Sequence, residues 1–228
     1  EWDYSNGFYT NNSRSASYYS WMWKRAKGYF DVVAYSGTGS PRTLAHSLGV
    51  VPEMIVCKSR STTGGWQTYH KTTGNTKYLY WNQNYPAQTS SSVWNNTTPT
   101  DSVFTVGNGG ELNGNNITYV AYLFATLAGI SKVGSYTGTG SDINVDCGFS
   151  AGARFILIKR TDATGEDWIY YDTVRGIVAG VDPFLKLNET NQQNAGNDGV
   201  DPLSSGFTVT SSSSNNTSGG TYIFYAIA

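Results

Sequence analysis

Short runs of apolar or alternating apolar and polar residues, separated by turn-forming residues, follow one another along the whole chain of 228 residues. No stretch keeps apolar residues at positions i, i+3, i+4 and i+7 over three turns, so the pattern predicts very little helix. Clusters of Gly, Asn, Ser and Thr between the runs are typical of turns that join strands. The pattern therefore predicts an all-β chain, with strands at Phe30–Ser36, Glu53–Ser59, Trp66–Lys71, Lys77–Asn82, Val103–Val106, Ile117–Ala125, Val133–Thr137, Arg154–Arg160, Trp168–Asp172, Phe184–Asn188, Phe207–Thr210 and Thr221–Ala228.

Four segments are almost continuously apolar: Met54–Cys57, Val120–Phe124, Phe155–Ile158 and Ile223–Ile227. Strands that are covered on both faces have this composition, so we expect these four at the centres of their sheets. The other strands mix Thr, Tyr and Trp, which favours half-exposed positions. Six or seven short strands in about 95 residues indicate a β-sandwich with jelly-roll-like connections.

The same sequence pattern occurs twice. Tyr35-Ser-Gly-Thr-Gly-Ser40 returns 101 residues later as Tyr136-Thr-Gly-Thr-Gly-Ser141, and Met54–Lys58 returns at the same offset as Phe155–Lys159. Further matches pair Trp66 and Tyr69 with Trp168 and Tyr171, Phe104–Val106 with Phe207–Val209, and Thr118–Tyr122 with Thr221–Tyr225. Chance similarity among Tyr, Gly and Thr-rich strands explains one such match but not an ordered series, which indicates a tandem duplication.

The duplication predicts the domain boundaries. Residues 28–127 form repeat 1 and residues 128–228 form repeat 2, two sandwiches that we expect to sit in line, joined by Thr126–Lys132. Residues 1–27 look like the last two strands of a preceding repeat, because Ser5-Asn-Gly-Phe8 is similar to Ser204-Ser-Gly-Phe207. We therefore expect the chain to be the C-terminal part of a longer polypeptide.

Charged residues make up only 14% of the chain, and the formal net charge is −1. Hydroxyl and amide side chains take their place on the surface, which is typical of extracellular β proteins and virion parts. The longest basic cluster is Trp23-Lys-Arg-Ala-Lys27, so the electrostatic signature of a nucleic-acid binder is missing. No apolar run approaches the roughly 20 residues of a membrane helix, and we expect no membrane insertion.

Two cysteines, Cys57 and Cys147, occupy non-equivalent positions of the two repeats. A disulfide inside one repeat is therefore excluded. Two buried thiols that pack as small apolar side chains are the simpler interpretation. The sequence leaves open a disulfide between the two repeats.

The sequence offers little catalytic chemistry. His46 and His70 are the two histidines, and His70 is matched by Asp172 in repeat 2, as expected for a polar strand end. The acids that could serve glycoside hydrolysis have no equivalents in repeat 1, and we interpret them as loop acids: Asp162, Glu166, Asp167, Asp172, Asp198 and Asp201. The Gly-Thr-Gly motifs precede no helix and are read as turns. We expect no enzymatic activity, no catalytic residues and no cofactor.

A metal site is a weaker alternative. Asn194, Asn197, Asp198 and Asp201 gather the oxygen ligands that Ca²⁺ prefers, but their spacing matches no EF-hand loop. We therefore predict no metal site.

Non-covalent binding is the class of function that remains after catalysis and metal binding. Sugar-binding sites combine aromatic faces with amide and hydroxyl groups, and long loops carry such residues in both repeats. The candidate binding residues are Tyr85, Trp94, Asn95, Gln192 and Asn194. The alternative is that Trp94 closes the edge of the sandwich and the polar loops only solvate it.

Several longer strings point to a known module: Gly28-Tyr-Phe-Asp-Val-Val33, Tyr119-Val-Ala-Tyr-Leu-Phe-Ala125, Ser131-Lys-Val-Gly-Ser-Tyr-Thr-Gly138, Phe155-Ile-Leu-Ile-Lys-Arg-Thr-Asp162 and Gly219-Gly-Thr-Tyr-Ile-Phe-Tyr-Ala-Ile-Ala228. Together they resemble a repeated β-rich module in structural proteins of tailed bacteriophages, including many marine and cyanobacterial phages. The resemblance covers the chain from about Tyr18 to Ala228. It carries no catalytic motif and no established binding residues.

The resemblance implies a tail-fibre or appendage subunit located in the virion. Such fibres are commonly homotrimers with receptor-binding tips, so the expected partners are further copies of this chain, other virion proteins and a host cell-surface glycan. Trimerisation would also bury exposed strand edges. Two alternatives stay open: a purely structural virion component, such as a capsid decoration or baseplate part, and a pair of accessory carbohydrate-binding domains from a secreted hydrolase.

Overall fold

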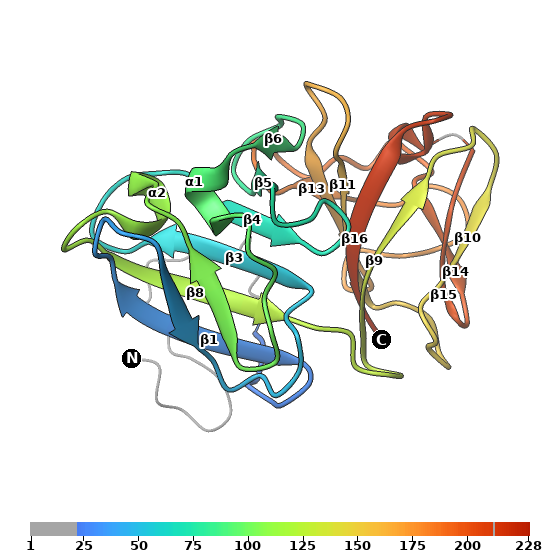
Figure 1. Cartoon of the computed structure of the whole chain (residues 1–228). Coiled ribbons are helices and arrows are strands. Elements are labelled where there is room, and N and C mark those ends of the chain that lie inside the picture. The colour runs from blue at the N-terminus through green and yellow to red at the C-terminus, as the bar shows by residue number, and fades with distance from the viewer. Residues whose placement is uncertain (1–21, 212) are drawn as a thin grey trace, which may run out of the picture.

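The computed structural model describes residues 22–211 and 213–228, which fold almost entirely into antiparallel β-sheets (Figure 1). Within these residues helix is confined to α1 (Ser91–Trp94), α2 (Gly110–Asn113) and the short 3-10 turn η1 (Ser214–Asn216). The predicted all-β sandwich fold is therefore confirmed. The predicted closing strands at residues 1–27 lie mostly outside the described residues. No helix in the described part is long and apolar enough to cross a bilayer.

The first half, residues 30–124, is a sandwich of a large and a small sheet. The large sheet has the order β1-β8-β3-β4-β5-β6 and the small sheet is the pair β2-β7. The strands are β1 (Phe30–Ser36), β2 (Arg42–Ala45), β3 (Met54–Ser59), β4 (Gln67–His70), β5 (Lys77–Tyr80), β6 (Gln88–Thr89), β7 (Val103–Val106) and β8 (Thr118–Phe124).

The second half, residues 131–227, has the same arrangement. Its large sheet has the order β9-β16-β11-β12-β13, which matches β1-β8-β3-β4-β5, and its small sheet has the order β10-β15-β14. The strands are β9 (Ser131–Thr137), β10 (Ile143–Asp146), β11 (Phe155–Arg160), β12 (Trp168–Asp172), β13 (Leu185–Lys186), β14 (Val200–Leu203), β15 (Gly206–Val209) and β16 (Thr221–Ile227). Where the repeat boundaries fall stays a prediction.

A buried asparagine explains the repeated Gly-Thr-Gly-Ser motif. Asn113 accepts a hydrogen bond from the Thr38 N–H at 2.9 Å and donates to the Ser40 carbonyl at 2.6 Å. It also donates to the Gly107 carbonyl at 2.7 Å, so one side chain ties three segments of the sandwich together. A Cβ atom at Gly37 would lie 2.1 Å from the Gly114 carbonyl oxygen, which leaves room only for glycine.

Asn216 repeats this clamp in the second half. It accepts from the Thr139 N–H at 2.9 Å and donates to the Ser141 carbonyl at 2.7 Å and to the Thr210 carbonyl at 3.0 Å. Each clamp lies beside a stacked tyrosine pair, Tyr35 on Tyr119 with ring centroids 5.1 Å apart and Tyr136 on Tyr222 at 5.0 Å. The two halves therefore share side-chain contacts as well as strand order.

Each sandwich has its own core between its large and small sheets. In the first half Ile55, Phe104 and Leu123 are fully buried or nearly so, and in the second half Ile156 and Phe207 take corresponding places. Cys57 belongs to the first core and Cys147 to the second, and both thiols are free. Burial raises the pKa of each thiol to about 12. The two cysteines are buried small side chains and form no bridge.

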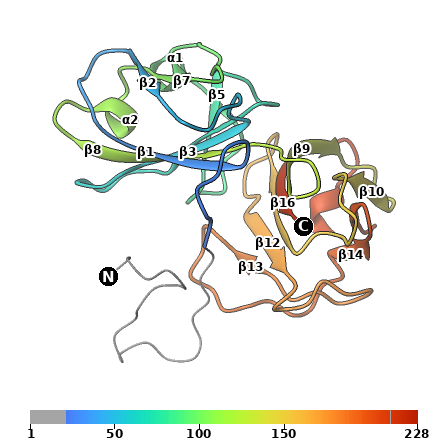
Figure 2. The same cartoon turned by 90° about the horizontal axis from the view of Figure 1, so that it is seen from below.

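The outer faces of the two large sheets pack against each other, and this contact holds the halves together. Met54, Val56 and Phe124 of the first half form one buried cluster with Val133 and Tyr225 of the second. A second cluster joins Leu79 to side chains of β11, β12 and β16. Figure 2 shows the large sheet of the first half on the side that faces the second half, with β2 and β7 on the far side. The halves therefore lie face to face rather than in line.

Burial along the strands follows from this packing. The apolar strands β3, β8, β11 and β16 are central in their sheets, as their composition predicts. The prediction of half-exposed flanking strands is wrong for β4 and β12, whose residues are all buried. The first half covers the outer face of β12. Sequence patterns also missed the short strands β2, β6, β10 and β14.

Candidate functional site

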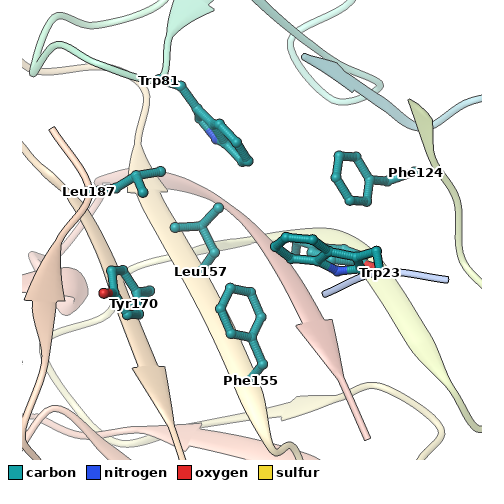
Figure 3. Close-up of a pocket in the computed structure, with 8 residues that line it drawn as sticks. Trp23, Trp81, Phe124, Phe155, Leu157, Tyr170 and Leu187 are labelled. Carbon is teal, nitrogen blue, oxygen red and sulfur yellow. The ribbon is translucent and has the colours of Figure 1, made fainter. Parts of the chain in front are cut away.

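An apolar pocket lies between the two halves (Figure 3). Its volume is about 140 Å³ and its surface is entirely apolar. The lining residues come from both halves and from the segment before β1: Trp23, Trp81, Phe124, Phe155, Leu157, Tyr170, Leu187 and Tyr225. Six of these eight are aromatic, so the pocket is a concave aromatic surface that the sequence builds from widely separated segments.

Strand alternation explains why these side chains meet. Ile156 and Ile158 of β11 point into the core of the second half, so Phe155 and Leu157 point to the outer face. Tyr170 of β12 lies on the same outer face. The pocket thus occupies the place where two sheet faces fail to fill the space between them.

Matching hydrogen bonds position the two residues that follow the short strands β5 and β13. The Trp81 N–H donates to the Trp66 carbonyl at 2.9 Å, and the Leu187 N–H donates to the Trp168 carbonyl at 2.8 Å. Trp81 and Leu187 therefore hold equivalent positions in the two halves. This position carries a tryptophan in the first half and a smaller leucine in the second.

Aromatic contacts fix the walls. Trp23 packs edge-on against Phe124 and Phe155, with ring centroids 6.0 and 6.2 Å apart. Phe124 contacts Tyr225 at 5.0 Å across the junction. Such tilted and edge-on pairs add about 0.5–1.5 kcal/mol each beyond the burial of their surface. Contacts from both halves therefore fix the aromatic side chains that line the pocket.

Trp168 anchors the junction next to the pocket. It is 1% exposed, its indole N–H donates to the Tyr80 carbonyl of the other half at 2.7 Å, and its ring meets Trp81 edge-on at 6.2 Å. Tyr225 has a pKa far above its ordinary value because burial disfavours the phenolate. The pocket therefore offers shape and apolar surface rather than acid–base chemistry.

His70 is buried at the junction and serves a structural role. Its Nδ1 accepts a hydrogen bond from the Thr72 N–H at 3.2 Å, which puts the ring proton on Nε2, facing the backbone of Phe224. Burial lowers the pKa of His70 to about 3, and Lys71 adds to this shift. His46 lies in an exposed turn, where it contacts the Thr100 carbonyl at 3.1 Å.

The buried imidazole predicts a pH-dependent stability. The unfolded state has a histidine pKa of about 6.5 and binds more protons than the folded state between there and about 3. Stability should therefore fall as the pH is lowered from about 6.5, and be unaffected by this group above that pH. Urea unfolding at about pH 7 and about pH 5 measures the difference, and His70→Asn should abolish most of it.

His46→Asn is the matched control for this experiment and should keep the wild-type pH response. Burial raises the pKa values of Glu53 and Asp31, but hydrogen bonds and nearby positive charges, including those of Lys71 and Arg25, together lower both below their ordinary values. These two acids therefore lose their contribution to stability only at more acidic pH. An unchanged pH response in His70→Asn would contradict the assignment.

Four of the six acids considered for hydrolysis, Asp162, Glu166, Asp167 and Asp172, form ion pairs. Arg160 donates to Asp162 at 2.8 Å and to Glu166 at 3.1 Å, and Lys186 lies 2.7 Å from Asp167. Asp172 forms an ion pair with Arg175, and both side chains are shielded from water. These contacts hold the β11–β12 turn and the start of the β12–β13 loop.

The oxygen-rich stretch considered for Ca²⁺ shapes its loop by hydrogen bonds. Asn194 Oδ1 accepts from the Gly196 N–H at 3.0 Å, and Asp201 accepts from the Gly180 N–H at 3.2 Å. In the part of the chain that the structure describes, no group of three or more His, Cys, Asp or Glu side chains is arranged to hold a metal ion.

The five predicted binding residues lie in three separate segments of the chain. Tyr85 lies between β5 and β6 and is 48% exposed, Asn95 follows α1 in an exposed left-handed turn, and Gln192 and Asn194 are exposed between β13 and β14. Trp94 is 2% exposed and packs edge-on against Tyr69 in the core of the first half. Trp94 therefore has no face open to a ligand, which agrees with the alternative that it closes the sandwich.

Sequence patterns did not indicate the pocket. The available signal was the near-continuous apolar character of Phe155–Ile158, which requires a cover on the outer face of β11. The repeat gave no indication that the other half supplies this cover.

The comparisons with known proteins give one family. A family model described as Domain of unknown function (DUF7483) matches residues 3–228. No curated protein matches the chain. No solved structure matches it either.

Proposed function

The chain belongs to the DUF7483 family, and we propose that it is a virion module of the tail-fibre type that binds a host-surface glycan without catalysis. The proposal includes association with further copies of the chain, as in the homotrimers that the sequence resemblance implies, and with other virion proteins. The observation that most directly supports this proposal is the position of Tyr85. This tyrosine is exposed and lies on a loop whose backbone is fixed at the junction of the two halves.

Two backbone hydrogen bonds fix this loop. The Ala87 N–H donates to the Thr161 carbonyl at 2.8 Å, and the Gly165 N–H donates to the Asn84 carbonyl at 3.1 Å. The loop of Tyr85 is thereby joined to the β11–β12 turn of the other half. A ring that is exposed yet carried on fixed backbone loses little conformational entropy when a sugar stacks on it, which supports a binding role.

Polar groups suitable for sugar hydroxyls lie on the same turn. Arg160 holds Asp162 and Glu166, which leaves carboxylate oxygens as acceptors beside the aromatic loop. An aromatic face next to groups that accept hydrogen bonds from sugar hydroxyls can hold a pyranose ring. Among the described residues, the seven-residue strands β1 and β9 lie at the edges of their sheets, and edge strands of this kind support association with further copies.

Binding to immobilised bacterial lipopolysaccharides and capsular polysaccharides tests the proposal. We expect Tyr85→Ala to weaken binding about tenfold, equivalent to about 1.4 kcal/mol, because the stacking face is lost. Tyr85→Phe keeps the ring and should bind within about twofold of wild type. Val174→Ala, at an exposed site on another loop, is the control.

Two results would count against the proposal. One is equal binding by wild type and Tyr85→Ala, which would place any glycan site elsewhere. The other is release of oligosaccharides from the immobilised polymers, which would indicate an enzyme.

A further inference from the structure

The aromatic pocket at the junction has the size of a small aromatic molecule. Its volume is about 140 Å³, and an apolar cavity of roughly 150 Å³ in another protein stays dry and binds benzene. Water gains little against the walls of this pocket because they offer it no hydrogen-bond partners. An apolar molecule of matching size regains the dispersion contacts that the side chains around an empty cavity lack.

The lining selects against sugars and other polar ligands. No polar atom contributes to the pocket surface, so each hydroxyl group of a bound sugar would lose water without gaining a partner. Such a loss costs about 1–3 kcal/mol for each group. The pocket is therefore distinct in its chemistry from the proposed glycan site around Tyr85.

The walls are already in place without a ligand. Hydrogen bonds at 2.9 and 2.8 Å fix the backbone at Trp81 and Leu187, and Trp23 is wedged between Phe124 and Phe155. Figure 3 shows Trp81 and Leu187 on one side of the pocket, with Trp23 and Phe155 on another. Binding to a preformed pocket requires little ordering of side chains.

We propose that the junction pocket binds small aromatic hydrocarbons of about the size of benzene. Because Leu187 is equivalent to Trp81, the substitution Leu187→Trp places an indole at a position whose counterpart already carries one. The larger side chain should fill the pocket and exclude the ligand.

Fluorobenzene is the probe, followed by fluorine NMR while the intact chain is titrated. We expect saturable broadening of the fluorobenzene signal with a Kd on the order of 1 mM or below. Cross-relaxation between the ligand and the indole protons of Trp23 and Trp81 should locate it. Leu187→Trp should weaken binding at least tenfold, whereas Val174→Trp, which adds an indole at a site that is 75% exposed, should bind as wild type does.

Absence of saturable binding to wild type, or equal binding to wild type and folded Leu187→Trp, would overturn the proposal. Far-UV circular dichroism establishes that the variant is folded. If Leu187→Trp does not fold, Leu187→Phe fills less of the pocket and should still weaken binding severalfold. Loss of polysaccharide binding in Tyr85→Ala is a separate result and leaves this proposal unaffected.

Discussion

Replacing Trp168 by alanine is expected to lower the free energy of unfolding by about 4 kcal/mol, as large-to-small substitutions of buried aromatic residues do. Trp168 is 1% exposed and lies where the halves meet. The substitution removes its contact with Trp81 and the hydrogen bond to the Tyr80 carbonyl. The partly buried carbonyl would then lose this donor, which adds to the cost of the cavity.

Urea unfolding followed by circular dichroism measures this loss. Trp66→Ala is the matched control, because Trp66 occupies the equivalent strand position but is only partly buried, and it should cost about half as much. A further expectation is that Trp168→Ala separates unfolding into two transitions, since each half retains its own core. A loss of less than about 1 kcal/mol for Trp168→Ala would show that the junction contributes little to stability.

Replacing Asn216 by alanine is expected to cost about 3 kcal/mol of stability, because five backbone groups lose a hydrogen-bond partner. These groups are the N–H groups of Thr139 and Gly140 and the carbonyls of Ser141, Val209 and Thr210. Thermal unfolding of the variant measures the effect. Asn113→Ala should behave alike, since Asn113 makes the same kind of clamp in the first half.

Asn144→Ala is the control for the clamp. Asn144 is exposed and accepts a single hydrogen bond from the Thr208 hydroxyl at 2.8 Å, so its removal should change stability by less than about 0.5 kcal/mol. Equal effects of Asn216→Ala and Asn144→Ala would contradict the structural role of the clamp.

The central strands could be predicted because composition alone identifies them. Met54–Cys57 and Phe155–Ile158 are apolar at every position, which few structures other than a strand covered on both faces accommodate in so short a segment. Turn chemistry then fixed the ends of β1, β7 and β12, whose predicted bounds agree with the structure. The local sequence pattern was therefore sufficient to predict strands that are buried and bounded by turn-forming residues.

The small sheets were harder to predict. In β2 only Leu44 is buried, and β10 contributes only Val145, so neither four-residue strand shows an apolar run. Their strand character comes from hydrogen bonds to β7 and β15, which lie about 60 residues away along the chain. Pairing between strands that lie so far apart along the chain leaves no signal in the local sequence pattern of either strand.

The candidate site was predicted only in part. The loops around Tyr85, Asn95, Gln192 and Asn194 are exposed, as a binding role requires, and their ligand stays a prediction. Trp94 is buried because an aromatic ring in a polar loop gains more from the core than from water. The pocket depends on how two folded halves pack, and no single strand encodes that.

Face-to-face packing has a consequence for longer chains of such units. Each large sheet has one outer face, and in this molecule the two faces cover each other. An interface made from the same surface on both sides closes on itself and does not propagate. A polymer of these sandwiches would therefore be a series of rigid pairs connected by linkers. An odd number of units would leave the apolar outer face of one large sheet uncovered.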